Sequence, residues 1–154
     1  MAETVFDRLH GRLRQAGAAF TVLRHEPVFT SEQAAAVRGT PLASGAKALV
    51  VKAGEAFALL VLPADRKLDS RKARDGLGVK ALRFATRDEV ERLTGLQPGS
   101  IPPFGSLFGL PTCCDPALGE NAAINFNAGD HSISVSMMHA NFVAVERPRM
   151  IALT

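Results

Sequence analysis

The side chains that could do chemistry in this chain are few, and none belongs to a known catalytic motif. The sequence has no G-x-S-x-G, no H-E-x-x-H, no Walker loop and no G-x-G-x-x-G. Its four histidines, His10, His25, His131 and His139, do not have metal-ligand spacing. The residues therefore indicate neither a metal site nor a nucleophile-base triad, and we expect no cofactor.

Lys47 is the charged residue whose surroundings are most informative. It stands in SGAKALVVK, at the start of a nearly all-apolar segment, so we expect it at the rim of a sheet, facing a cleft or water. An ammonium at such a rim suits phosphate, because it is a compact point charge. The alternative is a lysine that lays its stem on apolar surface and keeps its charge in water.

A second basic feature is the run DRKLDSRKAR, residues 65–74. One interpretation is a contact with the phosphate backbone of a nucleic acid. The other is a solvated helix face, since Asp65 and Asp69 interrupt the run. The formal net charge of +3 permits an anionic partner but does not require one.

The stretch QPGSIPPFG, residues 97–105, is unusually rich in glycine and proline for a connector. Proline fixes φ and removes a backbone donor, so this loop is stiff. Glycine lets the backbone approach a ligand closely. On composition alone, the loop is a rigid connector whose glycines allow the backbone to come close to a ligand.

Composition limits the class of protein. The chain has 154 residues, of which 47% are hydrophobic and 21% charged, as expected for one soluble globular domain. Its longest apolar runs are too short to span a membrane, and its first residues do not resemble a signal peptide. We expect a cytoplasmic protein with no membrane partner. The adjacent Cys113 and Cys114 are expected to be two reduced thiols on a strand.

These residues must be positioned by a mixture of helices and strands. Helices are predicted over 5–16, 30–39, 68–78 and 86–95 and near 136–141, with side-chain caps at Thr4, Thr30 and Thr86. Strands are predicted over 19–25, 80–85, 111–115, 122–129 and 131–136 and near 149–153, with a hairpin over 46–63 that turns at Gly54-Glu55. This order indicates an α+β fold with a mixed sheet and argues against a Rossmann layout, because regular βαβ alternation is lacking.

Six of these segments, in their order, resemble a known family. HEPVFTSEQAAAVRG, GAKALVVK, LPADRKLD, TRDEVERLTG, PGSIPPFG and NAGDHSISV are similar to segments of the YbaK/ProX family of aminoacyl-tRNA deacylases. That family is related to the editing insertion of bacterial prolyl-tRNA synthetase. The resemblance runs from about residue 20 to the C-terminus. It implies a single α+β domain over residues 1–154, with a mixed, partly barrelled β-sheet flanked by helices.

The resemblance also implies a set of site residues. The family's lysine falls on Lys47, where it would hold the phosphate or ribose end of the substrate. Its G-x-x-x-P loop falls on Gly99 to Pro103, where it would line the pocket with backbone groups. Its histidine on a late strand falls on His131. We take Lys47, His131 and Gly99 as catalytic candidates. The substrate-binding candidates are Ser100, Ile101, Pro102, Pro103, Phe104, Asp130 and His25.

The function that the resemblance implies is ester hydrolysis. The family cleaves the bond between an amino acid and the terminal adenosine of a mischarged tRNA, in some members with help from the ribose hydroxyl. An aminoacyl ester is already activated, so oriented backbone donors and one water can supply much of the acceleration. We expect a free-standing editing deacylase that binds the aminoacylated 3′ end of tRNA. An aminoacyl-tRNA synthetase is a further candidate partner.

The substrate stays open at this point. Cysteine-specific members carry a tyrosine near the pocket, and this chain has none. Alanine-specific members have a His-Pro-x-x-Asn segment where this chain has NFNAGDHSISV. Alanine, serine and threonine are the candidate amino acids, and proline tRNA is a candidate carrier. The alternative function is a non-catalytic nucleic-acid-binding or synthetase-associated module, although aromatic residues are only 6% and all are Phe, so stacking platforms are scarce.

Overall fold

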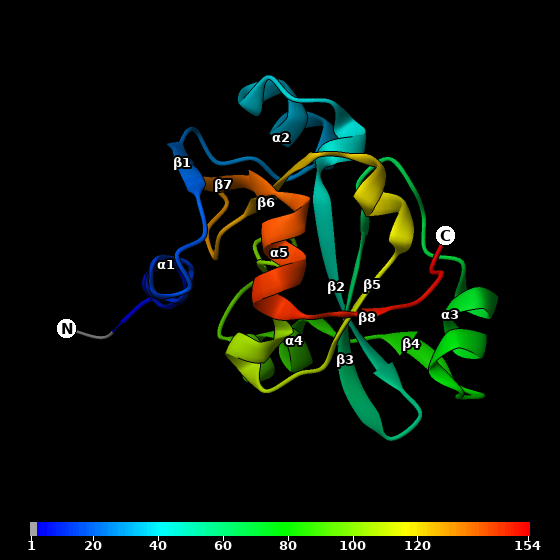
Figure 1. The fold of residues 1–154 in the computed structure, drawn as a ribbon. Helices are drawn as coiled ribbons and strands as arrows, with labels where there is room; N and C mark the ends of the chain where they lie inside the picture. The colour runs from blue at the N-terminus through cyan, green and yellow to red at the C-terminus, as the bar shows by residue number, and fades with distance from the viewer. Residues whose placement is uncertain (1–2) are drawn as a thin grey trace.

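The structure is a computed structural model that describes residues 3–154, and in it two open β-sheets are surrounded by helices (Figure 1). The smaller sheet is antiparallel and has the order β1-β7-β6: β1 Phe20–Arg24, β7 Ile133–Met138 and β6 Ala123–Asn127. The larger sheet is mixed and has the order β4-β2-β3-β5-β8: β4 Leu82–Phe84, β2 Ala46–Ala53, β3 Ala56–Pro63, β5 Thr112–Cys114 and β8 Arg149–Met150.

Four of the five α-helices in residues 3–154 begin at a residue whose side chain caps the first turn, and the last one, over 139–146, has no side-chain cap. The helices are α1 Val5–Gln15, α2 Ser31–Arg38, α3 Ser70–Leu77, α4 Arg87–Thr94 and α5 His139–Glu146, with 3₁₀ turns at Leu42–Ser44, Gly105–Phe108 and Pro116–Glu120. Thr4, Thr30 and Thr86 accept hydrogen bonds from backbone N–H groups in the first turns of α1, α2 and α4, as predicted. None of the helices in residues 3–154 is long and apolar enough to cross a membrane.

The α+β class with mixed strand directions is confirmed, but the sheets do not close into a barrel. Within residues 3–154, one isolated parallel bridge, Gly45 to Asn125, links the two sheets. The predicted boundary between β7 and the last helix was wrong. Strand β7 runs on to Met138, where it pairs with Ala123, and this pushes the last helix to 139–146. Pairing with a distant strand decides that boundary, and local sequence does not carry that information.

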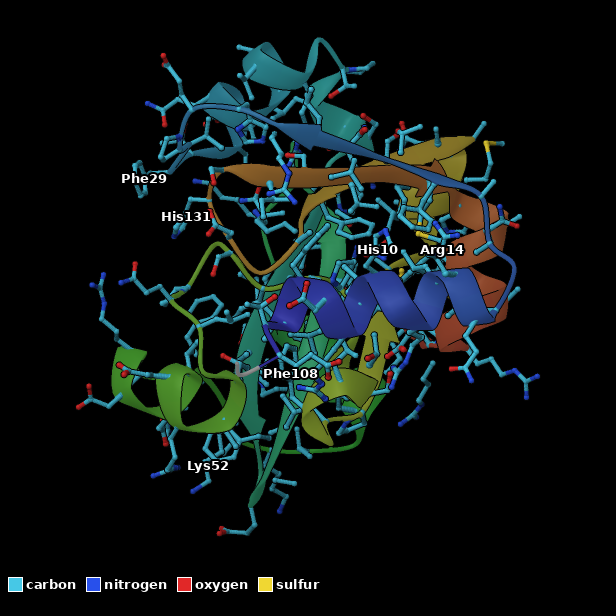
Figure 2. The ribbon with its side chains drawn as sticks, turned by 90° about the vertical axis from the view of Figure 1, so that its left-hand side faces the viewer. His10, Arg14, Phe29, Lys52, Phe108 and His131 are labelled. Atoms are coloured by element: carbon cyan, nitrogen blue, oxygen red, sulfur yellow. The ribbon has the colours of Figure 1, made fainter. Side chains whose placement is uncertain are left out.

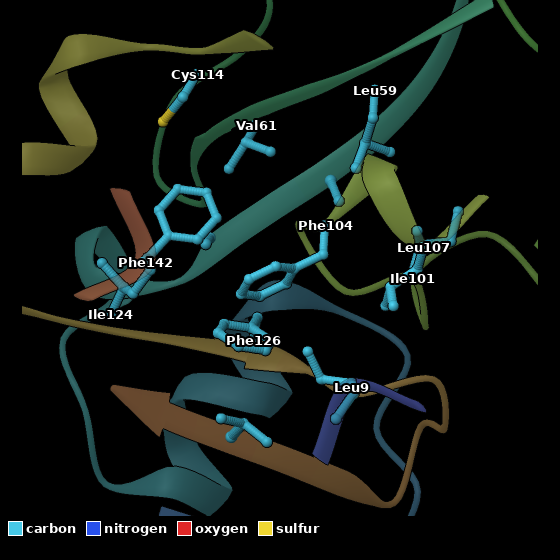
Figure 3. Packing of buried hydrophobic residues seen from close by; sticks show 14 of the residues in the cluster. Leu9, Leu59, Val61, Ile101, Phe104, Leu107, Cys114, Ile124, Phe126 and Phe142 are labelled. Atoms are coloured by element: carbon cyan, nitrogen blue, oxygen red, sulfur yellow. The ribbon is translucent and has the colours of Figure 1, made fainter. Parts of the chain in front are cut away.

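The main core lies between the two sheets. Three phenylalanines from distant segments meet there: Phe104 contacts Phe126 and Phe142, with ring centroids 5.7 and 5.3 Å apart (Figure 3). All three side chains are fully buried or nearly so. Burial of a phenylalanine stabilises a fold by about 1.5–3 kcal/mol. Because Phe104 belongs to the glycine- and proline-rich loop, that loop is anchored in the core.

A second core lies on the other face of the larger sheet, under α3. It contains Cys113, while Cys114 faces the main core, so both cysteines are buried free thiols, as predicted. Burial raises the pKa of Cys114 to about 12, so this thiol stays protonated and unreactive at neutral pH.

The first half of β2 has a strand partner on one side only. Strand β3 pairs with all of β2, whereas β4 reaches only Val51 to Ala53. In an antiparallel pair, the backbone groups of alternate residues face the same side. The carbonyl of Val50 accepts a hydrogen bond from Ala85 N on the β4 side, at 2.9 Å. The backbone N–H and C=O of Ala48 therefore point to that side too, where α2 lies near the start of β2 (Figure 1).

Candidate active site

A pocket of about 230 Å³ lies along this edge of β2. Its floor is the β2 backbone from Ala46 to Leu49, and α2 forms one wall. The lining also includes Phe126 and Asn127 at the end of β6 and Gly99 and Ile101 in the loop after α4. Small side chains dominate the lining, and the polar groups are Thr30, Ser31, Arg38, Thr40, Lys47 and Asn127.

Lys47 lies in this pocket, at the start of β2, as the sequence predicts. Its side chain is half-buried, and its Nζ donates a hydrogen bond to the carbonyl of Arg66 at 2.9 Å. Burial lowers the pKa of Lys47, and the carboxylates of Glu32 and Asp65 oppose that shift only in part. A desolvated ammonium gains more from a phosphate than a solvated one does.

The glycine- and proline-rich loop contributes two of its residues to the pocket, Gly99 and Ile101. Gly99 has φ +91°, a conformation that side-chain-bearing residues rarely adopt. Its carbonyl accepts a hydrogen bond from Asn127 Nδ2 at 2.7 Å, which fixes the loop against β6. The remaining candidates, Ser100, Pro102, Pro103 and Phe104, are buried behind the pocket wall. They hold the loop rigid and do not line the pocket.

Arg38 is a pocket residue that the sequence analysis did not identify. It lies in the last turn of α2, half-buried, and burial lowers its pKa to about 10. Its Nε donates to Ser134 Oγ and its Nη2 donates to Asn127 Oδ1, both at 2.8 Å. No carboxylate in residues 3–154 forms an ion pair with it. A partly desolvated guanidinium without a counterion is a candidate anion-binding group.

A chain of hydrogen bonds links Arg38 to two predicted residues. His25 Nε2 lies 2.7 Å from Ser134 Oγ, and its Nδ1 lies 2.7 Å from the carbonyl of Glu26. The continuous path runs from His25 through Ser134, Arg38 and Asn127 to the carbonyl of Gly99. His25 is not part of the pocket lining, so in this arrangement it positions Ser134 and contacts a ligand only through other residues.

His131 and Asp130 lie beside the pocket and not in its lining. Both are in the turn before β7, which begins at Ile133 and not at 131 as predicted. Asp130 accepts hydrogen bonds from the backbone and hydroxyl of Ser132, and these lower its pKa. The ring of His131 packs on the ring of Phe29, with centroids 4.8 Å apart (Figure 2). A Cβ built on Gly99 would lie 3.5 Å from His131 Cε1, so this pair adjoins the loop.

Two of the described lining residues of the pocket, Lys47 and Arg38, have cationic side chains. None of the described lining residues is Asp, Glu, His or Cys. A serine or threonine hydroxyl there has no general base in the lining to activate it. Residues 3–154 also contain no group of His, Cys, Asp and Glu side chains that could hold a metal ion. The arrangement is suited to binding an anionic ligand and presenting backbone groups to it.

The basic run at 65–74 makes contacts within the protein. Arg66 pairs with Glu120 at 3.3 Å, Lys72 donates to the carbonyl of Thr154, and Arg74 donates to Ser70. Because these basic side chains bind groups of the protein itself, the contacts favour a solvated helix face over a contact with nucleic acid.

Comparisons with known proteins agree on one family. A family model described as an aminoacyl-tRNA editing domain matches residues 25–144. The multifunctional Ser/Thr-tRNA deacylase ProXp-y of Escherichia coli strain K12 is 36% identical over 149 residues, which cover 94% of this chain and 89% of that protein. The proline–tRNA ligase of Trichlorobacter lovleyi is 32% identical over 77% of this chain, but the match covers only 21% of the ligase.

Solved structures show the same fold. One described as a candidate trans-editing enzyme for prolyl tRNA synthetase matches with a TM-score of 0.87 and 24% identity, covering 100% of this chain and 99% of that chain. A second, named hypothetical protein APE2540, also has a TM-score of 0.87, at 21% identity, over 95% of this chain and 98% of that chain.

Proposed function

The chain belongs to the aminoacyl-tRNA editing domain family, and from this premise we propose that it is a free-standing deacylase that hydrolyses the ester of mischarged tRNA. The observation that carries the proposal is the pocket along β2. It combines Lys47, Arg38, the Gly99 loop and an unpaired backbone edge in one cavity, with no acidic residue among the described lining residues to repel a nucleotide.

The chemistry requires few side chains. A water attacks the ester carbonyl carbon, the bond from that carbon to the ribose oxygen breaks, and a proton from the water passes to that oxygen, so the products are the free amino acid and the ribose hydroxyl of the tRNA. The backbone N–H of Ala48 is the donor that this edge offers to the developing oxyanion. Lys47 and Arg38 hold the anionic end of the nucleotide, and the vicinal ribose hydroxyl assists the attacking water. Positioning then supplies most of the acceleration.

The amino acid is proposed to be small and polar. The pocket's small lining residues leave room for a short side chain, and Thr30, Thr40 and Asn127 offer hydroxyl and amide groups to pair with a substrate hydroxyl. The E. coli relative is named for serine and threonine. We therefore propose serine and threonine esters as preferred substrates, with alanine next, because a buried polar group left unpaired costs more than a missing methylene.

The proposed partner is the aminoacylated 3′ end of tRNA. Likeness to a segment of proline–tRNA ligase supports proline tRNA as one carrier and a synthetase as a second, weaker partner. The alternative function is a nucleic-acid-binding module without turnover. The internal pairing of the 65–74 basic run argues against it.

The test is a panel of mischarged tRNAs that carry serine, threonine, alanine or cysteine, with correctly charged proline tRNA as a control. Ester loss is followed with radiolabelled amino acid. The proposal expects hydrolysis of the serine and threonine esters and no loss of the proline ester. Folded protein that binds these tRNAs but hydrolyses none of them would leave only the binding-module function.

A further inference from the structure

Phe29 is the large hydrophobic residue whose exposure is hardest to explain by folding. Its side chain is 71% exposed, the highest value among the exposed large hydrophobic residues of the described chain. It lines the pocket from the segment just before α2. A phenylalanine ring left in water does not gain the stabilisation that its burial would give. When the ligand is a nucleotide, an aromatic ring at the edge of a cationic pocket can stack on the base.

One contact fixes the backbone of Phe29 and another packs against its ring. The backbone N–H of Phe29 donates to Gln33 Oε1 at 2.9 Å, which ties its segment to α2. The ring of His131 lies against it, at an angle of 40° between the planes (Figure 2). His131 is itself fixed, because its Nδ1 lies 3.1 Å from the carbonyl of Val28, and Val28 N donates to the carbonyl of His131 at 3.0 Å.

We propose that Phe29, backed by His131, is the stacking platform for the terminal nucleobase of the substrate. A nucleotide has an anionic phosphate, which the pocket cations Lys47 and Arg38 match, and an aromatic base, which needs a π-face outside the pocket. Phe29 provides that face beside the cations. This inference rests on the proposed function and extends it, since it assigns His131 to support of the base and not to the bond-breaking step.

The test exploits the absence of tryptophan and tyrosine from the chain. Phe29→Trp gives the protein a single indole at the platform. Titration with AMP is expected to quench its fluorescence saturably, whereas ribose 5-phosphate, which has no base, is expected to leave it unchanged. Phe84→Trp is the matched control, because Phe84 is 60% exposed on β4 and does not line the pocket. Equal quenching of both variants, or none at Phe29→Trp, would overturn the platform.

Kinetics provide a second measurement. Base stacking on an aromatic side chain is worth roughly a 5- to 150-fold change in binding, so Phe29→Ala should raise KM for a hydrolysed tRNA by that factor and change kcat little. Phe84→Ala should change neither. His131→Ala should also act on KM, and a large fall in its kcat at unchanged KM would assign His131 to the chemistry and contradict the proposal.

The two proposals can fail separately. Quenching of Phe29→Trp by AMP, in a protein that hydrolyses no mischarged tRNA, would support Phe29 as a stacking platform and contradict the proposed deacylase function. Hydrolysis that is unaffected by Phe29→Ala, together with no quenching in Phe29→Trp, would keep the deacylase and reject the platform.

Discussion

Replacement of Arg38 by methionine should separate stability from function, because the cost of burying this guanidinium offsets the stabilisation from its two hydrogen bonds. Burial lowers the pKa of Arg38 from its ordinary value of 12.5 to about 10, yet at pH 7 the group is charged in both the folded and the unfolded chain. The shift corresponds to a penalty of roughly 3 kcal/mol, which we reduce to about 2 kcal/mol because the half-buried side chain is still screened by water.

Arg38→Met removes that penalty and also removes the hydrogen bonds to Ser134 and Asn127. Each is worth a net ~1 kcal/mol, so the two effects cancel and Tm should move by no more than about 3 °C. Activity should behave differently. Loss of one charge-assisted contact to the substrate costs about 1.5–3 kcal/mol, which lowers kcat/KM by roughly 10- to 150-fold.

The assay combines thermal unfolding, followed by circular dichroism, with deacylation of a serine-charged tRNA. Arg83→Met is the matched control, because Arg83 pairs with Glu89 at 2.7 and 2.9 Å and does not line the pocket. It should lower Tm slightly and leave activity intact. An Arg38→Met protein with full activity, or one that loses more than about 8 °C in Tm, would refute the reasoning and make Arg38 a structural residue.

Two further predictions concern the loop and the pH dependence of stability. Gly99→Val strains a backbone at φ +91° and should lower stability by about 1–3 kcal/mol, while activity falls more than tenfold because the wall of the pocket shifts. The control Gly78→Val, at φ +70° with open space around it, should be strained as much but keep its activity. Equal losses of activity in the two variants would refute the role of the loop. Burial lowers the pKa of His139, whose Nε2 has no partner within residues 3–154, so the folded protein favours the neutral ring. Stability should therefore fall as pH drops below about 6.5, the ordinary histidine pKa. Tm of His139→Leu should fall less over pH 7 to 5, and identical pH profiles would contradict this.

Features set by neighbouring residues could be predicted from the sequence. Thr4 with Asp7 and Thr86 with Glu89 form capping boxes within one helical turn, so these helices begin where the sequence says. The hairpin at Gly54-Glu55 likewise depends on a local turn. Lys47 was found because a lysine in an apolar strand is conspicuous.

Features set by distant contacts could not be predicted. Arg38 ends a helix just before a glycine, where a basic residue normally complements the helix dipole, so nothing local marks it as a pocket residue. Its partners lie 89 and 96 residues away in the sequence, and only the folded chain brings them together. The exposure of Phe29 could not be predicted from the sequence either, since a phenylalanine is first expected to be buried. The resemblance predicts Pro102 to Phe104 as pocket residues, but the sequence does not reveal which way each side chain faces, and in the fold they are buried behind the pocket wall.

The most direct test of the pocket as the site of hydrolysis is a comparison of Lys47→Met with Lys52→Met. Both lysines belong to β2, but Lys47 lines the pocket, whereas Lys52 lies at the other end of the strand over the ring of Phe57, at 5.8 Å. Single-turnover hydrolysis of serine-charged tRNA should fall at least tenfold in Lys47→Met and stay at the wild-type rate in Lys52→Met. Equal rates in the two variants would mean that hydrolysis takes place elsewhere on the protein.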